Sequence, residues 1–124
     1  MANQTVLIFD DDDDLLTIFS FLFEDMGWQV FTHPTCDDVL ERTRETKPDL
    51  ILMDNWIPTI GGIAATQLLK ADEELKAIPV IYISANNDVK ALSARAGADA
   101  FVAKPFDFDE LGALAKKLVN KTGV

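Results

Sequence analysis

The sequence predicts an α/β protein built on a doubly wound, five-stranded parallel sheet with helices on both faces. Short apolar, β-rich runs alternate five times with longer segments whose apolar residues recur at helical spacing. No linker, repeat or low-complexity segment interrupts this alternation. Strands that alternate with helices form parallel sheets, and one reversal of strand order places the carboxyl ends of all strands along one edge.

Five runs are predicted as strands. Leu50–Met53 is continuously apolar and ends at Asp54, which is typical of a strand buried on both faces. Pro58 follows at the distance of a short turn and helps to stop the ladder. The other predicted strands are Thr5–Phe9, Trp28–Phe31, Pro79–Ile83 and Ala100–Ala103.

Five helices are predicted to follow these strands. The first comes after a run of aspartates, and we expect Asp12 or Asp13 to cap it and Gly27 to end it. The others are predicted to start at Thr35 and end before Pro48, to follow Gly61-Gly62, to span Asp88–Arg95, and to be capped by Asp109. The residues expected on the apolar sides are Leu15, Ile18, Phe19, Leu22 and Met26 in the first helix, Val39 and Leu40 in the second, Ile63, Leu68 and Leu69 in the third, and Leu111, Leu114 and Leu118 in the last.

Phenylalanines are more numerous on the first helix than one apolar stripe requires. Phe19, Phe21 and Phe23 alternate over five positions. Core packing is the expected role, and a surface for self-association is the alternative. We expect a monomer or a weak homodimer.

Composition excludes several kinds of function. The formal net charge is −10 and the pI about 4.3, so neither direct nucleic-acid binding nor an anionic membrane surface is expected. No apolar run is long enough to span a membrane, and the N-terminus lacks a secretory leader. Cys36 has no second cysteine to pair with. These features predict a cytoplasmic protein.

Four of the predicted strands stop at a reactive polar residue. Asp10 and Asp11 follow the first strand, Asp54 the third, Ser84 the fourth and Lys104 the fifth. Three converging carboxylates repel one another unless a cation intervenes, and such oxygen ligands suit Mg²⁺. A lysine and a hydroxyl opposite them suit an anion with several oxygens. The residues therefore predict a site for Mg²⁺ and a phosphoryl group.

In these motifs the chain resembles the receiver domains of two-component response regulators, over essentially its whole length. The resemblance implies a flavodoxin-like sheet of strand order 2-1-3-4-5. It also implies a stand-alone receiver domain over residues 1–124, with no effector domain. The motifs that carry the resemblance are Val6-Leu-Ile-Phe-Asp10-Asp11, Asp49-Leu-Ile-Leu-Met-Asp54 with Pro58 and Gly62, Pro79-Val-Ile-Tyr-Ile-Ser84-Ala85, and Gly97-Ala-Asp-Ala-Phe101-Val-Ala-Lys104-Pro105-Phe106.

The resemblance also implies which residues carry out the chemistry. Asp54 is the nucleophile that accepts a phosphoryl group from a sensor histidine kinase or a histidine phosphotransfer protein. Asp11 binds Mg²⁺ directly and Asp10 acts through water. Asp54 and the backbone carbonyl of Trp56 complete the metal site. A bridging metal neutralises the charge that phosphoryl transfer places on the equatorial oxygens.

Further residues are expected to read the phosphorylated state. Lys104 pairs with one phosphoryl oxygen, and Ser84 with another, helped by the backbone N–H of Ala85. The family usually has a cis peptide between the lysine and the proline, here Lys104-Pro105. Phe101 stands at the switch position, where tyrosine is commonest in the family. Its movement is expected to remodel the face of the fourth helix, fifth strand and fifth helix for an unidentified output protein.

Two positions are expected to set how long the phosphoryl group lasts. Trp56 and Asn86 lie two places after the nucleophile and the hydroxyl, where the family tunes dephosphorylation. A bulky indole beside Asp54 is expected to obstruct the attacking water. The only histidine, His33, follows the second strand without a neighbouring base, so we expect a structural role for it.

As a signalling switch, the protein would catalyse only its own phosphotransfer and dephosphorylation and would not otherwise be an enzyme. Three other functions are alternatives to this one. The first is a phosphorelay shuttle or phosphate sink in the same signalling chemistry. Asp10-x-Asp12 imitates the nucleophile motif of Mg²⁺-dependent phosphatases of the haloacid-dehalogenase type, but those enzymes have their acidic metal pair late in the chain. A flavin-binding module fits the topology but lacks a phosphate-binding loop after the first strand.

Overall fold

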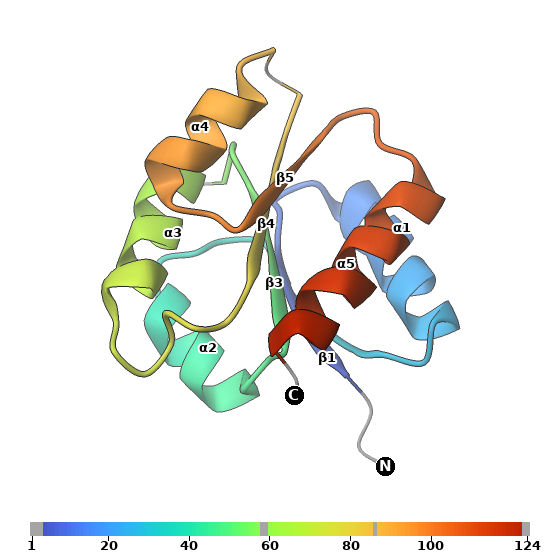
Figure 1. The fold of residues 1–124 in the computed structure, drawn as a ribbon, viewed down its shortest axis with the longest axis horizontal. Coiled ribbons are helices and arrows are strands. Elements are labelled where there is room, and N and C mark those ends of the chain that lie inside the picture. Colours follow the sequence, from blue (N-terminus) through green and yellow to red (C-terminus); the bar gives the residue numbers. More distant parts are fainter. Residues whose placement is uncertain (1–3, 58–59, 86, 123–124) are drawn as a thin grey trace.

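The sheet has the predicted class and strand order (Figure 1). The computed structural model describes residues 4–57, 60–85 and 87–122, with side chains to residue 119. Within these ranges five parallel strands have the order β2-β1-β3-β4-β5. The strands are β1 (Thr5–Phe9), β2 (Gln29–His33), β3 (Leu50–Asp54), β4 (Val80–Ser84) and β5 (Ala100–Ala103). The helices are α1 (Asp13–Asp25), α2 (Val39–Thr46), α3 (Gly61–Ala71), α4 (Val89–Ala96) and α5 (Phe108–Thr122).

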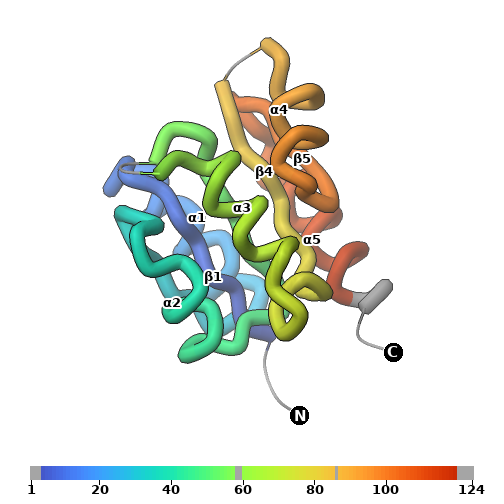
Figure 2. Tube along the Cα trace, turned by 90° about the vertical axis from the view of Figure 1, so that its left-hand side faces the viewer, coloured from blue at the N-terminus to red at the C-terminus, as the bar shows by residue number. Residues whose placement is uncertain are grey.

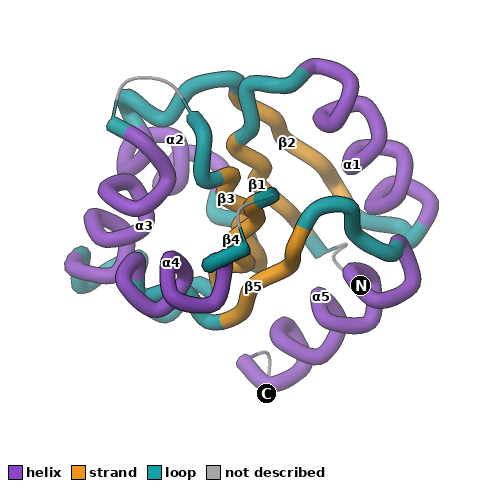
Figure 3. The backbone as a smooth tube through the Cα atoms, turned by 90° about the horizontal axis from the view of Figure 1, so that it is seen from above, coloured by secondary structure: helices purple, strands orange, loops and turns teal. Residues whose placement is uncertain are grey.

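Helices cover both faces of the sheet. Figure 3 shows α1 and α5 on one side and α2, α3 and α4 on the other, and Figure 2 looks onto the second group. Alternate residues of the central strands supply the two cores because side chains in a strand point to opposite faces. Leu50, Leu52, Ile81 and Ile83 pack towards α1 and α5, whereas Ile51, Met53 and Tyr82 pack towards the other helices. The prediction that β3 is buried on both faces is confirmed.

Two helix ends are as predicted. Asp12 caps α1, because its side chain accepts hydrogen bonds from the backbone N–H groups of Asp14 and Leu15, at 3.0 and 3.2 Å. Gly27 follows the end of α1 with φ +88°, a conformation that a residue without Cβ adopts readily.

Several predicted boundaries are wrong. The fourth strand runs over Val80–Ser84 and the fourth helix over Val89–Ala96, each shifted by one residue from the prediction. The second strand begins at Gln29, because Trp28 packs edge-on against Phe23, with ring centroids 5.1 Å apart. It also extends two residues further than predicted, to His33. The second helix begins at Val39 and not at Thr35. The last helix is capped by Asp107 and not by Asp109: Asp107 Oδ1 accepts the N–H groups of Asp109 and Glu110 at 2.8 and 3.1 Å.

The apolar stripes of two helices also differ from the prediction. In α1 the fully buried side chains are Phe19 and Phe23, joined by Leu16, whereas Ile18 is 38% exposed. Phe21 is 75% exposed and stands on the outside of the same helix. The predicted stripe is therefore right for Phe19, and Leu15, Leu22 and Met26 are partly buried against the same core. It included Ile18 wrongly and left out Leu16, because the sequence offers apolar residues on more than one side of α1. In α3, Leu68 points outward, while Ala65 and Leu69 face the core.

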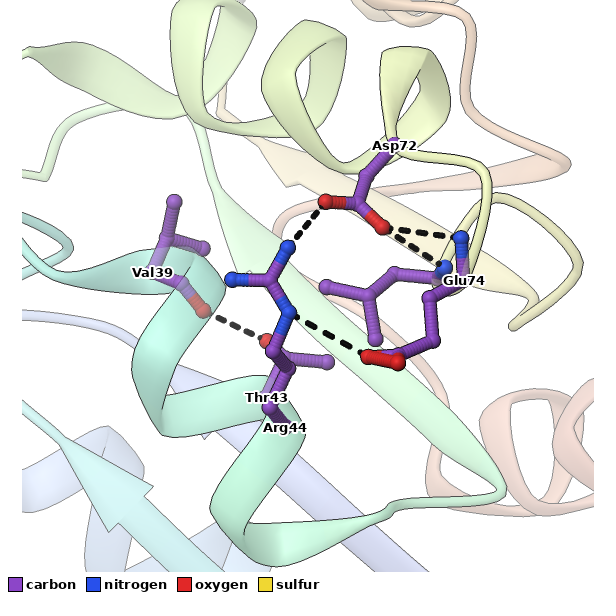
Figure 4. Close-up of polar contacts among 6 residues, drawn as sticks. Val39, Thr43, Arg44, Asp72 and Glu74 are labelled. Atoms are coloured by element: carbon purple, nitrogen blue, oxygen red, sulfur yellow. Dashed lines mark hydrogen bonds and ion pairs between the residues drawn. The ribbon is translucent and has the colours of Figure 1, made fainter.

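Ion pairs connect the segments at the amino-terminal end of the sheet. Arg44, in the last turn of α2, bonds to Asp72 and to Glu74 after α3 (Figure 4). Lys70 donates to the carboxylate of Asp99 at 2.7 Å and to the carbonyl of Ile78 at 2.8 Å. These contacts fix the positions of the loops that lead into the strands. No helix in the described ranges is both long enough and apolar enough to cross a membrane.

Candidate functional site

Strand register brings the predicted site residues to one edge. Phe9 pairs with Met53, so Asp10 and Asp54 follow at the same level on neighbouring strands. On the other side, Ser84 pairs with Ala103, and the backbone N–H of Lys104 donates to the carbonyl of Ser84 at 2.9 Å. Parallel strands that end together therefore place acids, hydroxyl and lysine in one crevice.

Three carboxylates form the centre of the site. Ligand oxygens of Asp10, Asp11 and Asp54 all lie within 4.8 Å of one another. Asp10 and Asp54 are 1% and 5% exposed, and Asp11 is open to solvent. Two buried acids beside an exposed third give a cation an oxygen-rich site with access from solvent.

The hydrogen bonds of Asp10 test whether a cation fits here. Its Oδ1 accepts the N–H of Asp12 at 2.9 Å. Its Oδ2 is buried and accepts no hydrogen bond from the described part of the chain, and the Lys104 ammonium lies 3.7 Å from it. A buried carboxylate oxygen without a donor is costly, and a divalent cation would satisfy it. The residues present therefore fit a magnesium ion.

Lys104 is the positive charge of the site. Its Nζ lies 2.7 Å from Asp54 Oδ1, and the lysine side chain is 22% exposed. Asp54 Oδ2 accepts the backbone N–H of Trp56 at 2.9 Å. Both oxygens of Asp54 therefore have a donor, which fixes the orientation of the carboxylate.

Burial and repulsion shift the acid–base behaviour of the site. Burial raises the pKa of Asp10 to about 6, and the charge of Asp54 adds to this rise. Burial also raises the pKa of Asp54, against the opposing hydrogen bond from Lys104. For Lys104 burial lowers the pKa, but the hydrogen bond to Asp54 and the negative charges of Asp54, Asp10 and Asp12 together outweigh it, so the net shift is upward. The lysine therefore stays charged while the acids resist sharing the crevice as anions.

The remaining predicted residues occupy the same edge or its neighbourhood. Ser84 is buried at the end of β4, and Ala85 follows it exposed. The Lys104–Pro105 peptide is cis, as the resemblance implied. Phe101 lies on β5 and is 42% exposed. The predicted roles of Pro58 and Asn86 fall outside the described residues.

The hydrogen bond between Tyr82 and Asn55 is not among the sequence predictions, and the close approach of Gly62 to Asp54 was predicted only in general terms. The Tyr82 hydroxyl donates to Oδ1 of Asn55, the residue that follows Asp54. A tyrosine in a buried strand needs a hydrogen-bond partner, and this signal was available in the sequence. The Gly61-Gly62 pair lacks the spacing of a phosphate-binding loop, so the sequence indicates close packing or a turn there. A Cβ built on Gly62 would lie 2.3 Å from the carbonyl oxygen of Asp54, so close packing is the role of Gly62.

Fold and site together define a class: a parallel α/β protein with a carboxylate cluster and a paired lysine at the carboxyl edge of its sheet. The family model described as the response regulator receiver domain matches residues 6–116. The chain therefore belongs to the receiver-domain family of response regulators.

Two relatives illustrate how closely the chain resembles other members of the family. The polar-differentiation response regulator DivK of Brucella ovis is 34% identical over 105 residues, covering 82% of this chain and 85% of DivK. The alkaline phosphatase synthesis transcriptional regulatory protein PhoP of Bacillus subtilis is 27% identical over 124 residues, which is 98% of this chain. The chain spans 51% of PhoP, about half the length of that relative.

A solved structure supports the comparison of the site. The receiver domain of a sensor histidine kinase from Pseudomonas aeruginosa superposes with a TM-score of 0.88 at 25% identity, covering 96% of this chain and 99% of that chain. A magnesium ion is coordinated in the active-site cleft of that structure.

Proposed function

We propose that this chain is a phosphorylation-dependent signalling switch in which Asp54 accepts a phosphoryl group from a phosphohistidine in a Mg²⁺-dependent reaction. The donor is a sensor histidine kinase or a histidine phosphotransfer protein, and the altered surface binds an output protein. The observation that carries the proposal is the cluster itself: three carboxylates within 4.8 Å of one another, with the Lys104 ammonium 2.7 Å from Asp54.

Asp54 suits the role of nucleophile for physical reasons. It ends a fully buried strand, so its backbone is held rigidly. One carboxylate oxygen attacks phosphorus while the bond from phosphorus to the donor imidazole nitrogen breaks, and the electron pair of that bond returns to the imidazole. The product is an acyl phosphate on Asp54. Rigid placement of the attacking oxygen is a large part of catalysis in phosphoryl transfer.

The neighbours of Asp54 have separate tasks. Asp10, Asp11, Asp54 and the Trp56 carbonyl would hold Mg²⁺, which when bound supplies charge neutralisation at the phosphoryl oxygens. In this structure the Lys104 ammonium donates to Asp54 Oδ1. Once Asp54 carries the phosphoryl group, we expect the ammonium to donate to a phosphoryl oxygen instead. Release of that contact is one way in which phosphorylation changes the site.

The output is expected to follow from Ser84 and Phe101. Ser84 would be drawn towards the phosphoryl group with the Ala85 N–H, and Phe101 would turn inward into the space that is left. Phe101 is partly exposed here, beside a hollow of about 500 Å³ lined also by Lys90 and Leu114. The face of α4, β5 and α5 is therefore the expected surface for the output protein. Backbone amide shifts on this face should move when beryllofluoride and Mg²⁺ are added; unchanged shifts would refute the switch.

Phosphoryl acceptance is tested with acetyl phosphate as donor. Wild type with Mg²⁺ should gain one phosphoryl group by intact mass, and Asp54→Asn should gain none. Asp13→Asn is the matched control, because Asp13 is an exposed acid in the first turn of α1, outside the cluster. Modification of Asp54→Asn at the wild-type rate would contradict the proposal.

The lifetime of the phosphoryl group provides a second test. The Trp56 side chain is 79% exposed next to Asp54, and the prediction that it obstructs the attacking water stands. Trp56→Ala should lose the phosphoryl group faster than wild type after the donor is removed. Loss at an unchanged or slower rate would contradict this assignment.

A phosphorelay shuttle is the second candidate function. The Pseudomonas aeruginosa neighbour is the receiver domain of a sensor kinase, which favours this alternative. Incubating phosphorylated chain with a histidine phosphotransfer domain distinguishes the two functions, since a shuttle returns the group to histidine and a terminal switch does not. That residues 1–124 form one receiver domain acting without an effector domain also stays a prediction.

A further inference from the structure

Tyr82 is the largest fully buried side chain in the described part of the chain, and its hydroxyl reaches the functional site. It lies in the middle of β4, in register with Met53 on one side and Phe101 on the other. Its hydroxyl donates to Asn55 Oδ1. The phenol ring thus spans from the core beneath the sheet to the residue that follows the acceptor aspartate.

Asn55 is held at three points. Its backbone N–H donates to the carbonyl of Ile83 at 2.9 Å, and its carbonyl accepts the N–H of Gly62 at 3.3 Å. The bond from Tyr82 fixes its side chain. The next residue is Trp56, whose N–H binds Asp54 Oδ2. The segment that leaves β3 is therefore attached to β4, to α3 and to the acceptor itself.

We propose that Tyr82 is a positioning residue for the metal site, acting through Asn55 to hold the Trp56 backbone where a divalent cation is bound. This inference rests on the proposed function. The main-chain bonds of Asn55 fix its ends, and the hydrogen bond from the tyrosine hydroxyl restrains its side chain. Groups that orient ligands contribute to metal affinity without touching the metal.

Tyr82→Phe tests the proposal because it removes one oxygen and leaves the buried ring in place. A single hydrogen bond contributes about 0.5–1.5 kcal/mol, so the Mg²⁺ dissociation constant measured by calorimetry should rise about two- to tenfold. Phosphoryl transfer from acetyl phosphate should fall at limiting Mg²⁺ and recover at saturating Mg²⁺. Loss that persists at saturating Mg²⁺ would contradict a role in metal positioning.

A matched control distinguishes a role of Tyr82 in metal binding from a purely structural role. Thr43→Val also removes a buried hydroxyl, one that donates to the Val39 carbonyl at 2.7 Å within α2 (Figure 4). The helix α2 contributes no residue to the acidic cluster of Asp10, Asp11 and Asp54. Both variants should unfold at lower urea concentration, but only Tyr82→Phe should weaken Mg²⁺ binding. Equal Mg²⁺ affinity in wild type and Tyr82→Phe would overturn the proposal.

A double-mutant cycle with Asn55→Ala checks the route. If Tyr82 acts through Asn55, the effects of the two substitutions on the Mg²⁺ dissociation constant should not multiply, because each removes the same contact. Fully multiplicative effects would refute that route. Failure of the proposed function has a different signature: wild type then gains no phosphoryl group, or Asp54→Asn gains it equally, whatever Tyr82→Phe does to Mg²⁺ binding.

Discussion

Substituting Gly62 by alanine should disturb the acceptor aspartate through a single methyl group. Gly62 is the second residue of α3, and its backbone has no positive φ, so alanine suits the local conformation. The added Cβ would nevertheless lie 2.3 Å from the Asp54 carbonyl oxygen and 3.1 Å from Asn55 Cα. Both are backbone atoms, which cannot rotate away as a flexible side chain would.

The magnitude follows from these distances. Ordinary contact begins at 3.4 Å, so the start of α3 and the end of β3 must separate by about 1.1 Å, the difference between 3.4 and 2.3 Å. Overpacking of this kind costs about 1–3 kcal/mol. Alanine in place of glycine in a helix returns at most about 1 kcal/mol. After the full offset, Gly62→Ala should therefore lower the free energy of unfolding by up to about 2 kcal/mol.

The same displacement should slow phosphoryl transfer. A shift of about 1 Å at a reacting group can reduce a rate by about 10²-fold. The free energy of unfolding is measured by urea titration, and the transfer rate by intact mass with acetyl phosphate and Mg²⁺. The rate should fall at least tenfold even where the variant is fully folded, since the displacement acts on Asp54 itself.

Gly112→Ala is the matched control. Gly112 lies inside α5, and its added Cβ would meet only the flexible Met26 side chain, at 3.4 Å from Sδ. This variant should keep the wild-type transfer rate and gain up to about 1 kcal/mol of stability. If Gly62→Ala proved as stable and as active as Gly112→Ala, the close approach of α3 to Asp54 would have no energetic meaning and the reasoning would be refuted.

Three further predictions concern the cap, the buried thiol and the lysine. Asp12→Ala should cost about 0.5–2 kcal/mol in urea titration, because two N–H groups of α1 lose their acceptor; an unchanged midpoint would refute the cap. Burial raises the pKa of Cys36 from 9.0 to about 11. As the pH rises, the unfolded chain therefore loses the thiol proton before the folded protein does. The stability contributed by the buried, protonated thiol is full below pH 9.0 and is lost as the pH approaches 11. Wild type should therefore lose about 2 kcal/mol more than Cys36→Ala between roughly pH 8 and 10.5, and parallel curves would contradict this. Lys104→Met should lose about 1–3 kcal/mol without Mg²⁺, and Mg²⁺ should stabilise it more than wild type because no ammonium competes for Asp54; an equal or smaller increment would argue against a shared site.

The sequence specified the fold class because its evidence is local and repeated. The continuous apolar run before Asp54 and the polar stops after each strand do not depend on distant contacts. The cap at Asp12 and the stop at Gly27 are equally local, since each follows from the conformation of one or two residues. Where the pattern was ambiguous, prediction failed in part: α1 carries apolar residues on several sides, and only packing left Ile18 and Phe21 exposed to solvent.

The sequence alone determined which chemical groups reach the carboxyl edge of the sheet, because a parallel topology sends every strand end to the same side. Only the tertiary structure decided how these groups pair. Lys104 bonds to Asp54 across 50 positions of sequence, and Tyr82 to Asn55 across 27. Such contacts depend on strand register and on the packing of crossover helices to within an ångström, and no local propensity encodes them.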